Sequence, residues 1–236
     1  MKLVLFDIDG TLVWTDGAGR RAIHHALIEV FGATGPADYR FDGKTDPQIV
    51  RDLMRVVGHA DGDIDDRMQQ VFDLYVERLR DELRAPGYRP RVMPGVYELL
   101  DALELHPDVV LGLLTGNLAD GARAKLESVG IDPRRFRVGA YGSDHEERSS
   151  LPEVARQRLL EGLGIDVMGT DCVIIGDTPA DVTCGRAVGA RAIGVATGRY
   201  DIEELRRHGA AAVFPDLSDT ATVVAEILAG EARPSC

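Results

Sequence analysis

Cysteine is scarce in this chain of 236 residues, and no apolar stretch approaches the length of a membrane span. The three cysteines, Cys172, Cys184 and Cys236, lack metal-site spacing, and we expect two small buried residues and one thiol in a frayed tail. Their odd number, without a recognisable secretory signal, predicts a reducing compartment, the cytoplasm. A transmembrane helix needs about 20 consecutive apolar residues, so the sequence argues against a membrane partner.

Positive charge is scarce too. Lys2, Lys44 and Lys125 are the only lysines among 27 basic residues, against 39 acidic ones, and the formal net charge is −12. Nucleic-acid backbones reward a basic face, so this balance argues against a nucleic-acid partner. An anionic substrate would need local positive charge or a metal ion to override the acidic surroundings.

Short apolar runs typical of buried strands alternate with helical patterns along most of the chain. Expected strands are 3–6, 109–114, 137–141, 172–175, 192–195 and 211–214; expected helices between them are 96–105, 118–129, 152–163, 180–188 and 202–208. This alternation predicts an α/β fold with a parallel sheet and right-handed crossovers.

The alternation is interrupted between the first strand and residue 109. No convincing strand occurs there, whereas segments 17–31, 46–57 and 65–83 carry apolar residues at helical spacing. We therefore expect an α/β core of residues 1–15 and 86–236 and an inserted all-helical cap of residues 16–85. Only the tail 230–236 has the composition of a disordered segment.

The first strand ends in a pair of carboxylates, Asp7 and Asp9, followed by Gly10-Thr11. Open α/β sheets bind their ligands at the carboxyl ends of the strands. Two neighbouring carboxylates on an apolar sheet edge repel each other and are costly to desolvate. The pair therefore predicts a hard cation such as Mg²⁺, which prefers oxygen ligands.

Three further signals follow later strands. Thr115-Gly116-Asn117 offers a hydroxyl and backbone N–H groups that suit an anion. A basic residue precedes the helix near Pro152, and Asp177 and Asp181 follow the strand 172–175. The acidic run 61–66 lacks the glutamate of a calcium-binding loop, so we interpret it as a helix start.

In this order and spacing the motifs resemble those of the haloacid dehalogenase superfamily of phosphatases and phosphotransferases, from residue 3 to about residue 217. The resemblance implies a Rossmann-like core with a helical cap inserted after the first motif. It also implies Mg²⁺ as cofactor, a small phosphorylated metabolite as partner, and an enzyme similar to phosphoglycolate phosphatases. The oligomeric state stays open.

Residue roles follow from matching the motifs. Asp7 corresponds to the nucleophile that forms an aspartyl-phosphate, and Asp9 to the general acid and base. Thr115, Gly116 and Asn117 correspond to the groups that hold the phosphoryl group. The resemblance implies that Mg²⁺ is bound by the Asp7 carboxylate, the Asp9 backbone carbonyl and Asp177, with Asp181 behind them or acting through water.

One position departs from the family pattern, which usually has a lysine before the helix near Pro152. The segment 142–152 contains no lysine. We expect Arg148 to supply the cation, since arginine offers both charge and a two-pronged donor to phosphate or carboxylate. Arg156, one helical turn inside the helix that follows, is the alternative.

The cap offers a candidate substrate contact in the turn 42–47. Lys44 there resembles a residue of the family's substrate-specificity loop, and the alternative is an exposed lysine in a helix-capping loop. Trp14 is expected to pack at the cap hinge, with a substrate wall as the alternative.

The sequence thus predicts a Mg²⁺-dependent hydrolase of small phosphomonoesters. A phosphotransferase of the β-phosphoglucomutase type and a catalytically inactive binding protein are the alternatives. A carbon–halogen hydrolase is disfavoured by Asp9 and Asp177, and a phosphonatase by the single lysine that the cap offers, Lys44.

Overall fold

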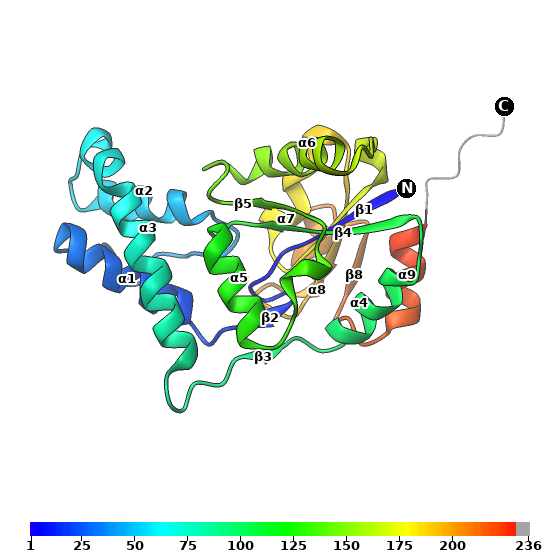
Figure 1. Ribbon diagram of the computed structural model, residues 1–236, viewed down its shortest axis with the longest axis horizontal. Helices are drawn as coiled ribbons and strands as arrows, with labels where there is room; N and C mark the ends of the chain where they lie inside the picture. Colours follow the sequence, from blue (N-terminus) through cyan, green and yellow to red (C-terminus); the bar gives the residue numbers. More distant parts are fainter. Residues whose placement is uncertain (230–236) are drawn as a thin grey trace.

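The computed structural model describes residues 1–229 and shows a six-stranded parallel sheet in the order β5-β4-β1-β6-β7-β8 (Figure 1). The strands are β1 (Lys2–Phe6), β4 (Val109–Thr115), β5 (Val138–Tyr141), β6 (Cys172–Gly176), β7 (Arg191–Val195) and β8 (Ala212–Phe214). All six lie where the apolar runs predicted them, and the α/β fold class is confirmed. β1 lies at the centre, where the chain order reverses, so the carboxyl ends of β1, β4 and β6 adjoin one another.

Helices cover both faces of the sheet because each strand alternates its side chains between them. Val4 and Phe6 of β1 pack on the face that carries α4 (Val96–Glu104), α5 (Ala119–Ser128) and α9 (Thr220–Leu228). Leu3 and Leu5 belong to a second buried cluster, with α6 (Leu151–Leu163) and α7 (Pro179–Cys184), and α8 (Ile202–Arg207) packs beside α7. As predicted, Cys172 and Cys184 are buried free thiols, whereas Cys236 lies outside the described residues.

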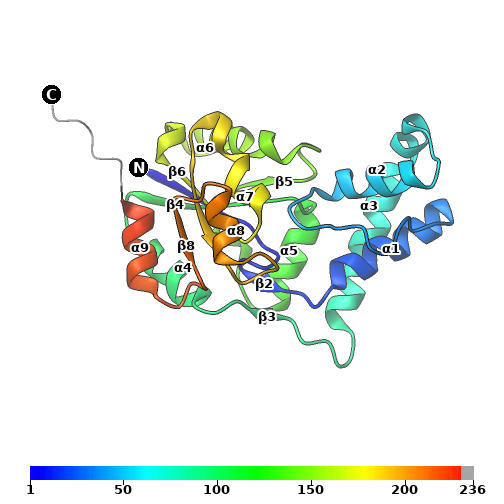
Figure 2. The ribbon, with the colours of Figure 1, turned by 180° about the vertical axis from the view of Figure 1, so that it is seen from behind.

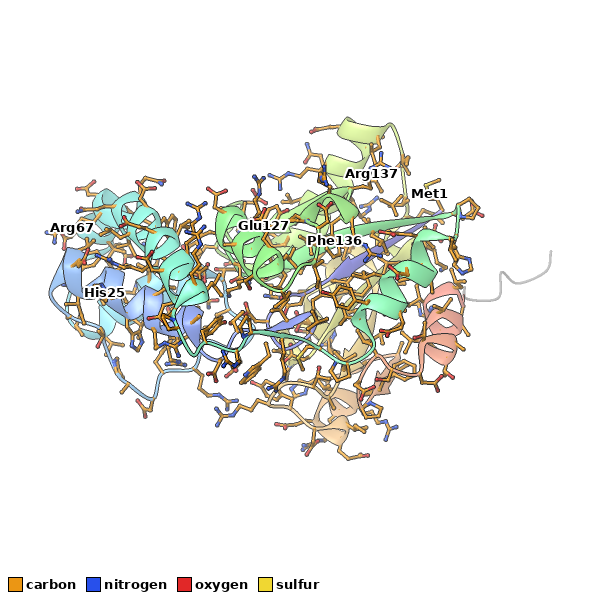
Figure 3. The ribbon with its side chains drawn as sticks, turned by 60° about the horizontal axis from the view of Figure 1, so that its bottom comes forward. Met1, His25, Arg67, Glu127, Phe136 and Arg137 are labelled. Atoms are coloured by element: carbon orange, nitrogen blue, oxygen red, sulfur yellow. The ribbon has the colours of Figure 1, made fainter. Side chains whose placement is uncertain are left out.

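A helical unit follows β1 and is formed by α1 (Ala18–Phe31), α2 (Asp46–Val56) and α3 (Asp61–Arg84). These helices enclose a hydrophobic cluster of their own, which Leu118 of the α/β part joins. The unit faces the end of the sheet at which β1 ends, on the side of the molecule away from α9 and Met1 (Figures 1, 2 and 3). It therefore covers the carboxyl ends of the central strands.

The structure differs from the sequence expectation in three respects. Two short strands, β2 (Val13–Trp14) and β3 (Arg91–Val92), pair antiparallel where the chain leaves for the helical unit and returns. Two residues are too few to produce a readable alternation, so the expectation of no strand before residue 109 was wrong. α9 was not predicted, because its threonines and valines disfavour a helix by propensity, although Asp219 caps it.

The third difference concerns α3, which begins at Asp61 rather than at residue 65. Asp61 and Asp63 lie in its first turn, where negative charge is stabilised by the helix dipole. The acidic run is therefore a helix start. The tail that was predicted to be disordered, 230–236, lies outside the described residues. No helix of residues 1–229 has both the length and the apolar character needed to cross a bilayer.

Candidate active site

The sheet register brings the predicted motifs to one edge. Phe6 of β1 lies opposite Leu113 of β4 and Ile175 of β6, so Asp7, Thr115 and Asp177 follow at neighbouring strand ends. The chain turns sharply after Asp9 at Gly10, which has a φ of 87°. A Cβ atom at Gly10 would lie 2.4 Å from Asp177 Oδ2, so only glycine lets the two motifs approach this closely.

Three buried carboxylates, those of Asp7, Asp177 and Asp181, form a cluster whose oxygen atoms lie within 4.8 Å of one another. Burial and the charge of Asp181 raise the pKa of Asp7 to about 7, even though Arg148 opposes the shift. Burial and the charges of Asp181 and Asp7 raise the pKa of Asp177 well above its ordinary value. Both shifts show uncompensated negative charge, which a divalent cation would relieve.

The donor set at this cluster suits Mg²⁺. Asp7 and Asp177 offer carboxylate oxygens, and the Asp9 carbonyl accepts no hydrogen bond from residues 1–229. Asp181 is less available, because its Oδ2 accepts hydrogen bonds from the backbone N–H and hydroxyl of Thr178 at 2.9 and 2.6 Å. The first of these bonds, together with the bond from Asp181 N to the Thr178 hydroxyl at 3.2 Å, forms the capping box of α7. Asp181 is therefore less free than Asp7 and Asp177 to bind a cation.

Arg148 reaches the carboxylates from the turn before α6. Its Nη2 donates to Asp7 Oδ1 at 2.7 Å and to Asp181 Oδ1 at 2.5 Å. The side chain is 8% exposed, and its buried Nε has no acceptor within the described chain. Arg156, the alternative cation, instead binds the Val167 carbonyl and Glu153. Of the two arginines, only Arg148 contacts the carboxylate cluster.

Asp9 belongs to a separate network with Lys125, which the sequence analysis did not assign. Lys125 Nζ lies 2.6 Å from Asp9 Oδ2 and 2.5 Å from Asn117 Oδ1, and Asn117 Nδ2 donates to Asp9 at 2.8 Å. Burial raises the pKa of Asp9, but the Lys125 ammonium and these hydrogen bonds outweigh it and hold that pKa below its ordinary value. Asp9 is therefore ionised.

One signal could have identified Lys125. Position 125 lies two helical turns after Asn117 and is flanked at i−3 and i+1 by apolar residues, so it belongs to the inward face of its helix. A lysine on a buried face requires a carboxylate partner. The lysine is 3% exposed in the structure.

The Thr115-Gly116-Asn117 turn is also where the helical unit meets the α/β part. The Thr115 hydroxyl is buried and accepts a hydrogen bond from Asn117 Nδ2 at 2.7 Å. Gly116 touches the chain of the helical unit: its carbonyl accepts from Asp46 N at 2.7 Å, and a Cβ atom at Gly116 would lie 2.0 Å from the Lys44 carbonyl. No side chain other than glycine fits at this turn.

The side chain of Asp46 adds a second hydrogen bond between the helical unit and this turn. Its Oδ2 accepts from the Leu118 backbone N–H at 2.8 Å. Burial raises the pKa of Asp46 to about 6, against the opposing charge of Lys125. The segment 44–46 thus rests directly on the loop that is expected to hold phosphate.

A cavity of about 480 Å³ lies between the carboxylates and the helical unit. The helical unit lines it with Arg20, Ile23, Phe41, Lys44, Ile49 and Tyr75. The α/β part lines it with Asp7, Asp9, Thr115, Asn117, Lys125, Arg148 and Asp177, together with Trp14 and Arg199. Lys44 lines it, but the Lys44 ammonium contacts Tyr39 Oη at 2.5 Å and Asp52 at 3.0 Å. Trp14 both lines the cavity and packs against Arg91.

Comparison with known proteins agrees with this arrangement. Residues 4–186 match the family model of the haloacid dehalogenase-like hydrolases. The chain is similar to a phosphoglycolate phosphatase of Rhodospirillum rubrum, 31% identical over 92% of this chain and 88% of the relative. It is also similar to a 5'-nucleotidase of Pseudomonas aeruginosa, 29% identical over 87% of each chain.

A solved structure of a hydrolase from Pseudomonas syringae shares the fold, with a TM-score of 0.71, 24% identity, and coverage of 97% of this chain and 100% of that one. The family match spans most of the chain and includes every motif at the sheet edge. The chain belongs to the haloacid dehalogenase-like hydrolase family.

Proposed function

We propose that this protein is a Mg²⁺-dependent phosphatase that hydrolyses a small phosphomonoester through an aspartyl-phosphate. The observation that carries the proposal is the cluster of Asp7, Asp177 and Arg148. It places a guanidinium 2.7 Å from the Asp7 carboxylate and a second carboxylate oxygen, from Asp177, within 4.8 Å of it. Phosphoryl transfer needs these groups together, since charge neutralisation and positioning supply most of the catalysis.

Asp7 is the nucleophile in this proposal. Its carboxylate oxygen forms a bond to phosphorus while the bond from phosphorus to the leaving oxygen breaks. Arg148 holds Asp7 through Oδ1, and Oδ2 accepts no hydrogen bond within residues 1–229. Asp7 itself lines the cavity. The unpartnered Nε of Arg148, the Thr115 hydroxyl and the Gly116 N–H would hold the phosphoryl oxygens.

Asp9 moves the protons. Because Asp9 is ionised beside Lys125, it must first take up a proton. It gives this proton to the leaving oxygen and then takes one from the water that hydrolyses the aspartyl-phosphate, which returns it to the protonated form. Lys125 and Asn117 fix the orientation of its carboxylate. Mg²⁺, held by Asp7, Asp177 and the Asp9 carbonyl, would supply the positive charge that lets two anions approach.

The helical unit, proposed as a cap, encloses the other side of the cavity. A small cavity closed by Asp46 and Lys44 against Gly116 favours a small substrate and excludes bulk water. The names of the two similar enzymes, a phosphoglycolate phosphatase and a 5'-nucleotidase, support a phosphomonoester as substrate.

The test is phosphate release from p-nitrophenyl phosphate, with Mg²⁺ and with EDTA, by the wild type and by Asp7→Asn. We expect hydrolysis that requires Mg²⁺ and is lost in the variant. Hydrolysis that survives EDTA or the substitution would refute the proposal. Formation of isomers from hexose phosphates without phosphate release would favour a mutase instead.

A further inference from the structure

We propose that Arg20, in the first turn of α1, binds a carboxylate on the leaving group of the substrate. Preferred substrates are then small phosphomonoesters of hydroxy acids. This inference rests on the proposed phosphatase function and adds the chemical class of the leaving group, together with the residue that recognises it.

Ion pairing within the cavity singles out Arg20. Most cations that line the cavity already have carboxylate partners: Lys44 pairs with Asp52, Lys125 with Asp9, and Arg148 with Asp7 and Asp181. Arg20 pairs with no carboxylate of residues 1–229, and its one hydrogen bond goes from Nη2 to the Tyr39 carbonyl at 2.9 Å. Arg199, also unpaired within this range, is exposed at the rim.

The guanidinium of Arg20 is held in place before any ligand binds. It lies 4.0 Å from the centre of the Phe41 ring, over which it stacks. Together with the bond to Tyr39, this stacking fixes the guanidinium and leaves Nε and Nη1 without an acceptor in the described chain. Nη2 carries a second N–H, which lies parallel to either the Nε–H or an Nη1–H, so one two-pronged donor remains for the two oxygens of a carboxylate. The fixed geometry lowers the entropy lost on binding.

The positive charge of Arg20 is felt by its neighbour one helical turn away. Burial, and then the charge of Arg20, lower the pKa of His24. In a chain with a net charge of −12, a substrate with two anionic groups meets an unfavourable overall field. An unpaired cation in the cavity offsets that field at the place where the second anion would lie.

The spacing between Arg20 and the reacting groups suits a short leaving group. A Cβ atom at Gly19 would lie 3.2 Å from Lys125 Nζ, which is itself 2.6 Å from Asp9 Oδ2. These two distances and standard backbone lengths place the Cα atom of Arg20 within about 11 Å of Asp9 Oδ2. The Arg20 side chain and a leaving group of a few atoms bridge that distance.

The experiment compares substrates that differ only in the second group. The probes are 2-phosphoglycolate, which carries a carboxylate, 2-hydroxyethyl phosphate, which carries a hydroxyl, and ethylene glycol bisphosphate, which carries a second phosphate. Phosphate release with Mg²⁺ gives kcat and KM for each. We expect the wild type to prefer the carboxylate over the hydroxyl by about tenfold or more in kcat/KM, mostly through KM, as for a charge-assisted hydrogen bond.

The variants are Arg20→Gln, Arg20→Lys and the control Arg21→Gln. Arg21 adjoins Arg20 but is exposed and pairs with Glu82 outside the cavity. We expect Arg20→Gln to reduce the ratio of carboxylate to hydroxyl kcat/KM about tenfold, Arg20→Lys to reduce it less, and Arg21→Gln to leave it unchanged. Thermal unfolding curves of the three variants check that each is folded.

The other outcomes separate the two proposals. No hydrolysis of these probes or of p-nitrophenyl phosphate by the wild type would refute the phosphatase function and, with it, this inference. Hydrolysis without a preference, or with a preference that Arg20→Gln leaves intact and Arg199→Gln abolishes, would refute the role of Arg20 alone. An Arg20-dependent preference for the bisphosphate over the carboxylate would refute the carboxylate assignment.

Discussion

Replacing Asp7, the proposed nucleophile, should stabilise the metal-free protein while it removes activity. Asp7 has a pKa of about 7 in the folded chain against an ordinary value of 3.8, so the folded state holds its proton more tightly. A raised pKa contributes stability below about pH 4, and this contribution is lost as the pH rises toward 7. At pH 8 the ionised carboxylate therefore costs up to about 4 kcal/mol.

Asp7→Asn removes the charge and keeps an oxygen that can accept the Arg148 hydrogen bond. Arg148 also retains Asp181 as a charged partner. Because one ion pair is lost, we expect a gain of about 2 to 4 kcal/mol in the free energy of unfolding at pH 8 in EDTA, and almost none at pH 4. Urea denaturation followed by circular dichroism, at both pH values, measures the difference.

The control is Asp101→Asn, which removes an exposed carboxylate that pairs with Arg135 and should change stability by less than about 0.5 kcal/mol. Saturating Mg²⁺ should reduce the difference in the free energy of unfolding between wild type and Asp7→Asn, because only the wild type offers the full set of charged ligands. An Asp7→Asn variant no more stable than the wild type at pH 8 in EDTA would refute the electrostatic account of this cluster.

Three further outcomes follow from the same contacts. Lys125→Met should lower kcat for p-nitrophenyl phosphate at least tenfold, since Asp9 loses its charged partner. It should also move the basic limb of the pH profile, which reports loss of the Asp9 proton, to higher pH, because Lys125 lowers the pKa of Asp9; an unchanged profile would contradict this role. Arg148→Ala should abolish turnover, whereas Arg156→Ala should leave kcat within about twofold because Arg156 binds only Val167 and Glu153; the reverse order would show that Arg156 supplies the cation. Mg²⁺ affinity should rise from pH 5 to pH 8, and binding should release a proton, since Asp7 must lose its proton to bind the cation. Calorimetry in two buffers of different ionisation enthalpy measures both; pH-independent binding would count against the ligand set.

The sequence was sufficient to predict the sheet and the main acids because both depend on local patterns. Buried parallel strands read as apolar runs, and Asp7, Asp9 and Asp177 directly follow such runs. The partners of Lys125 and Asp46 could not be predicted, because each contact depends on how a helix packs near a distant strand end. The partners of Arg20, which are Tyr39 and Phe41, lie in the loop between α1 and α2. Lys44 illustrates the limit: it lines the predicted cavity, yet its ammonium contacts Tyr39 and Asp52 within the helical unit.

The two leading carboxylates are separated by one residue, yet their surroundings shift their pKa values in opposite directions. Asp7 faces two further acids and shares one guanidinium with Asp181, so its pKa is raised, whereas Asp9 has the Lys125 ammonium and the Asn117 amide, so its pKa is lowered. Carboxyl groups whose pKa values are shifted in opposite directions take different roles in acid–base chemistry.

Near neutral pH, a cation at the carboxylate cluster would determine whether Asp7 is ionised, since a divalent charge beside Asp7 favours the anion. Lys125 determines the protonation state of Asp9 in the same way. Asp9 must break its hydrogen bond with Lys125 in order to carry a proton. In the proposed reaction, metal binding would control the ionisation of Asp7, and the buried Lys125 would control the proton transfers of Asp9. Substitutions at Asp177 and Lys125 should therefore impair different halves of the reaction.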